Sequence, residues 1–246
     1  MSEKTVGVIG GMGPDATVEL MRRVIASTPA TDDADHIHMI VDNNPKVPSR
    51  IKALIEGTGE NPGPTIAEMA RRLANAGADF LVIPCNTAHY YYDYAAEAVS
   101  VPVVNLVDLT VSTVLAGLTK PKRVGMLASP AVRLVGIFDQ AFRDHAIEVV
   151  YPELEDQLLD VIKAVKAGRV DASDEAAFNA VAEKLGTEAV DCLVIACSEL
   201  SVIPECLQSR LPVFDTLTIL SDDIIARAKG AGATDESEQT AARRTG

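Results

Sequence analysis

Two cysteines stand at matching positions in the chain and are the residues best suited to chemistry. Cys85 follows the apolar run LVIP, Cys197 follows the apolar run LVIA, and each precedes small polar residues. This pattern predicts that both cysteines lie at the carboxyl ends of parallel strands, where open α/β sheets bind their ligands. The helix that follows such a strand offers free backbone N–H groups to an anion.

A pair of thiols facing one ligand suggests proton transfer at carbon. Inverting a carbon that bears an acidic hydrogen requires a base on one face and an acid on the other. Cysteine has an unperturbed pKa of about 8.5, and a helix N-terminus lowers it, so Cys85 and Cys197 could exchange these two roles. The hydroxyls of Thr87 and Ser198 are placed to stabilise negative charge on a substrate carboxylate.

The two cysteines belong to an internal repeat. VGMLASPAVRLVGIFDQAF at Val124 is similar to VGVIGGMGPDATVELMRRVI at Val6, an offset of 118 residues. ADFLVIPCNTAHY is similar to VDCLVIACSELSV, which pairs Cys85 with Cys197 at an offset of 112, and VPVVN at 101–105 is similar to LPVFD at 211–215. Three blocks in the same order indicate two similar lobes related by a pseudo-twofold axis.

Hydrophobic periodicity predicts that strands and helices alternate along the first half. The predicted strands are Thr5–Ile9, His38–Val41, Phe80–Ile83 and Val101–Asn105, and the predicted helices are Ala16–Ala26, Thr65–Ala76, Ala88–Ala98 and Thr110–Ala116. Alternation of this kind is typical of a parallel sheet covered by helices on both faces. We therefore expect an α/β fold of two Rossmann-like lobes, with the active site in the cleft between them.

The repeat also predicts the domain boundaries. Residues 1–118 form the N-terminal lobe, which can also receive the C-terminal helix, and residues 119–229 form the C-terminal lobe. The segment 230–246 has no apolar periodicity and is predicted to be a flexible tail.

Composition excludes several classes of function. The chain has 246 residues, 48% of them hydrophobic, and a formal net charge of -13. An acidic chain argues against nucleic acid or an anionic membrane surface as a partner. Because no signal peptide or membrane-spanning run is found, we expect a cytoplasmic protein whose cysteines are free thiols.

The other candidate residues have simpler interpretations. Cys192 and Cys206 are predicted to pack without reacting, as buried free cysteines usually do. The cysteine and histidine spacing predicts no metal site. His89 could act as a general base, but a histidine just inside a helix near Cys85 is expected to orient it or cap the helix. Tyr90 is expected to make core or dimer contacts.

Four motifs resemble the aspartate/glutamate racemase family, and more closely its aspartate racemase branch, up to about Ala228. They are GGMGPDAT at 10–17, PCNTAH at 84–89, VKAG at 165–168 and ACSEL at 196–200. The resemblance implies a cofactor-independent amino-acid racemase, which acts on aspartate or glutamate, uses Cys85 and Cys197 as its acid/base pair and forms a homodimer.

The same resemblance implies a set of substrate-binding residues. Met12, Gly13, Asn86 and Thr87 would hold the α-carboxylate. Arg50, in NNPKVPSR, would pair with the distal carboxylate, and Lys166 would lie near it.

Three motifs depart from the family pattern and leave the substrate open. The chain has PSRI at 48–51 for the usual PDRT, ASPAV at 128–132 for ATxGT, and ACSE for GCTE. The second change removes two threonine hydroxyls, which Ser129 replaces only in part. One lost hydrogen bond to a buried polar group can change discrimination by orders of magnitude.

Other functions stay open at this point. A hydantoin racemase would share both cysteines, whereas the related decarboxylases and isomerases typically keep a single essential one. GMGPDA also matches a loose dinucleotide fingerprint, and a noncatalytic protein that binds an amino acid or nucleotide is a further alternative.

Overall fold

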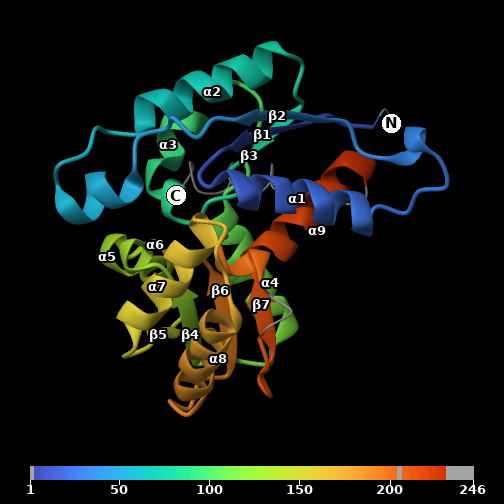
Figure 1. Cartoon of the computed structure of the whole chain (residues 1–246). Coiled ribbons are helices and arrows are strands. Elements are labelled where there is room, and N and C mark those ends of the chain that lie inside the picture. The colour runs from blue at the N-terminus through green and yellow to red at the C-terminus, as the bar shows by residue number, and fades with distance from the viewer. Residues whose placement is uncertain (1–2, 204–206, 231–246) are drawn as a thin grey trace, which may run out of the picture.

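The computed structural model describes residues 3–203 and 207–230, and in these it contains two parallel sheets with helices around them (Figure 1). The first sheet has the order β2-β1-β3 and the second has the order β5-β4-β6-β7. The predicted α/β fold is therefore confirmed. The elements of the first half are β1 (Val6–Gly10), α1 (Pro14–Ser27), the 3-10 turn η1 (Asp33–Asp35), β2 (Met39–Asn43), the π-helix η2 (Lys52–Glu56), α2 (Gly63–Asn75), β3 (Phe80–Val82), the 3-10 helix η3 (Thr87–Tyr91), α3 (Tyr92–Ala96) and α4 (Leu106–Gly117). Those of the second half are β4 (Arg123–Ala128), α5 (Pro130–Val135), α6 (Ile137–Arg143), β5 (Glu148–Val150), α7 (Glu155–Lys166), α8 (Ala172–Gly186), β6 (Cys192–Ala196), the 3-10 turn η4 (Leu200–Val202), β7 (Val213–Asp215) and α9 (Thr216–Lys229).

The strand registers reproduce the repeat found in the sequence. Val6 pairs with Phe80 between β1 and β3, and Val124 pairs with Cys192 between β4 and β6. These pairs are related by the offsets of 118 and 112 residues that align the two halves of the sequence. The two cysteine-bearing loops therefore leave equivalent strands, β3 beside β1 and β6 beside β4.

Two predicted elements of the first half differ from the structure. Val101–Asn105 is a single parallel bridge between Val103 and Leu81, not a strand. Pro102 has no N–H to donate to a neighbouring strand, and Asn105 is already the N-cap of the next helix. Only Val103 and Val104 between them are therefore free to pair with β3. The predicted helix Ala88–Ala98 is split into η3 and α3, because the backbone of Tyr91, at φ -108° and ψ 18°, leaves the helical region.

Helix α4 begins four residues earlier than the predicted Thr110. The Asn105 side chain accepts a hydrogen bond from the Val107 N–H at 3.0 Å, which is the usual role of asparagine as an N-cap. Asp215 caps α9 in the same way through the Leu217 N–H at 2.9 Å. The last helix of each half thus starts directly at the edge of its sheet.

Each half contributes its last helix to the other half's core. Val111 and Val114 of α4 belong to the hydrophobic core of the second sheet, whereas Leu220 and Ile224 of α9 belong to that of the first. Figure 1 shows α9, in red, beside α1. The division at residue 118 stays a proposal, with α4 and α9 packed across it. Of the predicted tail 230–246, all but Gly230 lies outside the described residues.

None of the helices between residues 3 and 230 that the structure describes is both long and apolar enough to cross a lipid bilayer.

Candidate active site

A pocket of about 170 Å³ lies where the two halves meet. Nine of the ten predicted site residues line it, namely Met12, Arg50, Cys85, Asn86, Thr87, Ser129, Lys166, Cys197 and Ser198. The lining is completed by five residues that were not predicted, Ser49, Ile51, Ile162, Ala196 and Glu199. Gly13 is not in the lining, but a Cβ added to it would lie 3.4 Å from the Glu199 carboxylate, so Gly13 is close to the pocket wall.

Cys85 lies just beyond β3 and is 6% exposed. Its carbonyl oxygen is 2.9 Å from Nδ1 of His89, and the Leu106 N–H donates to Nε2 of the same ring at 3.1 Å. Since a backbone N–H can only donate, Nε2 carries no proton, and Nδ1 donates to Cys85. Burial lowers the pKa of His89 to about 4, so the ring is neutral at pH 7. His89 therefore fixes the backbone of Cys85, and both of its ring nitrogens are engaged by backbone groups and not by the pocket.

Cys197 lies just beyond β6 and is 5% exposed. Its Sγ donates to Oε2 of Glu199 at 3.1 Å, and the other carboxylate oxygen of Glu199 pairs with the Lys166 ammonium at the end of α7. Lys166, Glu199 and Cys197 thus form a chain of contacts in which the thiol has a charged partner. The equivalent position beside Cys85 is occupied by the uncharged Thr87.

The two halves of the pocket therefore differ electrostatically. Burial raises the pKa of the Cys197 thiol well above its usual value, and the Glu199 carboxylate raises it further. Burial alone would lower the pKa of Lys166, but the attraction of Glu199 outweighs it and the pKa is raised. At neutral pH, Cys197 is a protonated thiol and Lys166 is a cation.

Arg50 is the second cation in the pocket lining. Its guanidinium donates to the backbone carbonyl of Pro48 at 3.0 Å and more weakly to that of Val47 at 3.4 Å. Its Nε is buried and has no hydrogen-bond partner among the described residues. An arginine whose contacts are all neutral oxygens keeps its charge available for an anion that enters the pocket.

Asn86 offers the pocket a hydrogen-bond acceptor. Its Nδ2 donates to Oγ1 of Thr216 at 3.0 Å, and that hydroxyl donates its single proton to the Ile195 carbonyl at 3.0 Å. The amide orientation is thereby fixed, because the Thr216 oxygen can only accept from Asn86. This leaves Oδ1 of Asn86 buried without a partner in the described structure.

The missed residues had partial signals in the sequence. Glu199 stands two residues after Cys197 in the ACSEL motif, at the place that Thr87 occupies in the first repeat. Ser49 and Ile51 flank Arg50, and Ile162 lies one helical turn before Lys166. Only Glu199 adds chemistry, and nothing in the sequence indicated that it would contact the thiol.

The remaining candidate residues lie away from the pocket. Cys192 is fully buried in the second core, where burial raises its pKa to about 12, and Cys206 lies outside the described residues. Tyr90 is 53% exposed and makes an edge contact with Tyr91. Within the described ranges, no three His, Cys, Asp or Glu side chains are grouped in a way that could hold a metal ion.

Comparisons with known proteins match the chain over nearly its whole length. A broad specificity amino-acid racemase of Bacillus subtilis, RacX, is 26% identical over 227 residues, which cover 90% of this chain and 96% of that protein. The structure of an aspartate racemase from Picrophilus torridus is 30% identical, covers 92% of this chain and 94% of that chain, and superposes with a TM-score of 0.78. A glutamate racemase from Francisella tularensis shares the fold, with a TM-score of 0.67 at 18% identity over 96% of this chain and 86% of that chain.

The family model for Asp/Glu/Hydantoin racemase matches residues 9–223. This match, together with the aspartate racemase structure, confirms the family and the branch predicted from the four motifs. The chain belongs to the Asp/Glu/Hydantoin racemase family and is an enzyme, an isomerase that acts on amino acids without pyridoxal phosphate.

Proposed function

We propose that the enzyme inverts the α-carbon of an acidic amino acid, aspartate or glutamate, with Cys85 and Cys197 as opposed acid/base thiols and without a cofactor. The observation that carries the proposal is the pocket itself. Cys85 and Cys197 line it from equivalent strand ends of the two halves. A stereocentre bound between them would present one face to each thiol.

The charge balance of the pocket supports an acidic substrate. Arg50 and Lys166 each carry one positive charge, Glu199 carries one negative charge, and the thiols are neutral when protonated. With both thiols protonated, the net charge of these groups is one positive unit, and it falls to zero once Cys85 is a thiolate. In either state the two cations outnumber the fixed carboxylate, which favours a substrate with one net negative charge, such as an acidic amino acid with two carboxylates and one ammonium. Arg50, which has no carboxylate partner in the described structure, is proposed to bind the side-chain carboxylate.

The size and polarity of the pocket support a small substrate. A volume of about 170 Å³ is below the roughly 300–1,000 Å³ of pockets that hold drug-sized ligands. The unpartnered Oδ1 of Asn86 can accept from the substrate ammonium. The hydroxyls of Thr87 and Ser129, 3.4 Å apart, can donate to the α-carboxylate, as Ser198 can.

The proton path follows from these contacts. In one direction the Cys85 thiolate removes the α-hydrogen and the protonated Cys197 thiol delivers a proton to the opposite face. In the reverse direction the roles exchange: Cys197 must first lose its proton, which Glu199, 3.1 Å from its sulfur, is placed to accept, and Cys85 must be a protonated thiol that delivers its proton to the opposite face. The Lys166 ammonium pairs with the other oxygen of the same carboxylate.

The test is incubation of the purified enzyme in deuterium oxide with single enantiomers of aspartate, glutamate, alanine and a hydantoin. We expect α-deuterium incorporation, followed by NMR, and inversion, followed by chiral chromatography, with an acidic amino acid. Cys85→Ala and Cys197→Ala should each abolish inversion. Cys192→Ala is the matched control, because this thiol is buried in the core and does not line the pocket.

Other outcomes would overturn the proposal. Inversion of the hydantoin alone would identify a hydantoin racemase, carboxylate loss would identify a decarboxylase, and binding without exchange would identify a noncatalytic protein. The homodimeric state and the cytoplasmic location stay predictions, and sedimentation velocity tests the first of them.

A further inference from the structure

Beside the pocket, a buried ion pair is joined to the turn that carries Cys197. The Cys197 carbonyl accepts from the N–H groups of Leu200 at 2.9 Å and Ser201 at 3.2 Å, which closes the turn. The Ser201 side chain then donates to Oδ1 of Asp215 at 2.6 Å. Ser201 is fully buried, so its hydroxyl has no access to bulk water and this bond fixes the turn to the start of α9.

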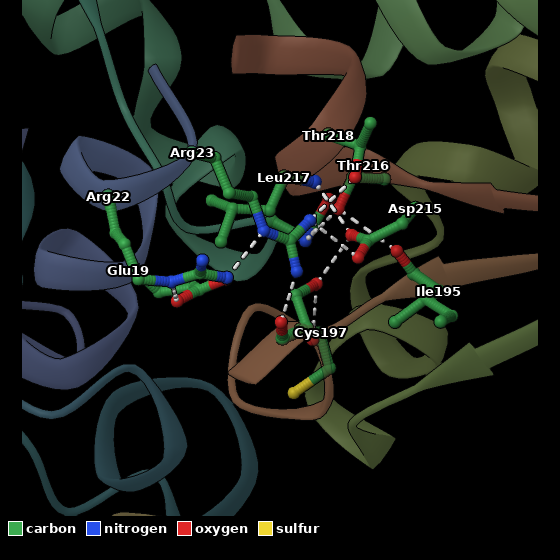
Figure 2. Close-up of polar contacts among 11 residues, drawn as sticks. Glu19, Arg22, Arg23, Ile195, Cys197, Asp215, Thr216, Leu217 and Thr218 are labelled. Atoms are coloured by element: carbon green, nitrogen blue, oxygen red, sulfur yellow. Dashed lines mark hydrogen bonds and ion pairs between the residues drawn. The ribbon is translucent and has the colours of Figure 1, made fainter. Parts of the chain in front are cut away.

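Arg23 of α1 contacts both Ser201 and Asp215. Its NH1 donates to Oδ2 of Asp215 at 2.8 Å and to the hydroxyl of Thr218 at 2.6 Å, while its NH2 donates to the Ser201 carbonyl. Its Nε donates to Glu19 at 2.7 Å. Figure 2 shows the guanidinium between Glu19 and Asp215, with Cys197 beneath the same cluster.

Burial makes this contact set rigid. The side chains of Arg23 and Asp215 are each only 10% exposed. Burial alone would lower the pKa of Arg23, but Asp215 and Glu19 raise it, so the cation persists at all working pH values. Arg23 does not line the pocket, and each guanidinium nitrogen already has a protein partner, so it is not a ligand-binding cation.

The described part of the first half, from residue 3 on, contains no counterpart of this arrangement. The residue four positions after Cys85 is the neutral His89, which occupies the place of Ser201, and the residue equivalent to Arg23 in the second half is Ala141. Charged contacts therefore position only the second of the two thiols.

We propose that Arg23 is a positioning residue for Cys197, which it aligns through Asp215 and the Ser201 carbonyl, and that its loss slows the half-reaction at Cys197 selectively. The proposal rests on the two-thiol racemase function. A displaced sulfur lengthens the proton-transfer path at Cys197, and misplacement of about 1 Å can cost on the order of 100-fold in rate. The contacts of Cys85 and of the pocket cations do not include Arg23.

The experiment measures primary deuterium isotope effects on kcat/KM with α-deuterated L- and D-aspartate. Because the two enantiomers have equal free energies, kcat/KM is the same in both directions for every variant, and only the isotope effects report which proton transfer limits the rate. Cys85→Ala identifies the enantiomer whose α-hydrogen faces Cys197, since only that enantiomer can still exchange.

For Arg23→Gln we expect kcat to fall about 10- to 100-fold with KM changed less than about threefold. The isotope effect should rise for the enantiomer that faces Cys197 and fall toward one for the other, whose α-hydrogen is removed by Cys85 before the slow step. Arg23→Lys keeps the charge and should recover part of the rate. Arg72→Gln is the matched control, because it removes an ion pair of similar length, 2.6 Å to Asp42, away from either thiol.

Ser201→Ala provides a test that does not depend on Arg23→Gln folding. It removes the bonds of the Ser201 hydroxyl to Asp215 at 2.6 Å and to the Cys197 carbonyl at 3.5 Å, and it leaves the ion pair of Arg23 and Asp215 in place. As for Arg23→Gln, the isotope effect should rise for the enantiomer that faces Cys197 and fall for the other, each by a smaller amount. Isotope effects that stay equal to those of the wild type in either folded variant would overturn the role of Arg23. If the wild type itself does not racemise, the proposed function fails, and the role of Arg23 fails with it.

Discussion

The Cys197 sulfur donates a hydrogen bond to the Glu199 carboxylate at 3.1 Å, whereas Thr87 occupies the equivalent place beside Cys85. This contact makes the two thiols of a repeated fold chemically different. It predicts that the direction in which Cys197 is the base relies on Glu199 as a proton acceptor.

Replacing Glu199 with glutamine should lower the pKa of the Cys197 thiol. The carboxylate raises that pKa, and its removal also leaves the Lys166 ammonium beside the sulfur without its anion, so both changes favour the thiolate. The pH dependence of Cys197 alkylation, measured by mass spectrometry, checks the shift. Racemisation should nevertheless fall, by about 10²- to 10⁴-fold, because the proton acceptor is gone. An unchanged alkylation profile would refute the coupling.

Replacing Arg50 with glutamine should reduce the preference for acidic substrates. Charge-assisted hydrogen bonds contribute about 1.5–3 kcal/mol, so kcat/KM for aspartate should fall about 10- to 150-fold. The value for alanine, if measurable, should change little, because its side chain cannot contact the guanidinium. Arg71→Gln, an exposed surface change, serves as the control. An equal loss for both substrates would contradict the assignment of Arg50 to the side-chain carboxylate.

His89 should make the stability of the fold depend on pH between about 4 and 6.5. Its folded pKa is lowered to about 4 from 6.5, so the unfolded chain binds the proton more tightly. The stabilisation is complete above pH 6.5 and is lost as the pH falls toward 4, a change of about 3 kcal/mol in the free energy of unfolding. His89→Gln should flatten the difference in urea denaturation curves across this range. His145→Gln, at an exposed position, should leave the curve like that of the wild type.

A side chain at Gly7 or Gly125 should destabilise the fold by overpacking its core. A Cβ at Gly7 would lie 2.5 Å from Leu81, and a Cβ at Gly125 would lie 2.8 Å from Leu193, the equivalent leucine of the second repeat. Alanine at either position should cost about 1–3 kcal/mol of stability by overpacking. Gly186→Ala, whose Cβ would have an ordinary 3.6 Å contact, is the control for thermal melting. A melting temperature unchanged by both core substitutions would contradict the packing.

Much of the fold could be predicted because the repeated blocks and the apolar runs of the strands are visible in short stretches of the sequence. The prediction of a strand at Val101–Asn105 was wrong because the next helix starts early. With Asn105 used as its N-cap and Pro102 unable to donate, only a single bridge at Val103 can form. The start of α4 was missed because Leu106 and Val107 look like a continuation of the apolar run.

The site was predicted from motifs, but the relations between distant residues could not be. Glu199 stands in a quoted motif, yet its contact with Lys166 requires α7 to end beside β6. Arg23 and Asp215 are separated by 192 residues, so their contact has no local signal in the sequence. From the sequence alone, Arg23 would be interpreted as an exposed residue on the polar face of an amphipathic helix.

The most direct test of the two-thiol mechanism is the stereochemistry of α-hydrogen exchange in the two single-cysteine variants. In deuterium oxide, Cys85→Ala should exchange the α-hydrogen of only the enantiomer that faces Cys197, and Cys197→Ala should exchange only the other, both without inversion. Opposite preferences of this kind would place one thiol on each face of the substrate carbon. Exchange of both enantiomers by either variant, or the same preference in both, would contradict the account.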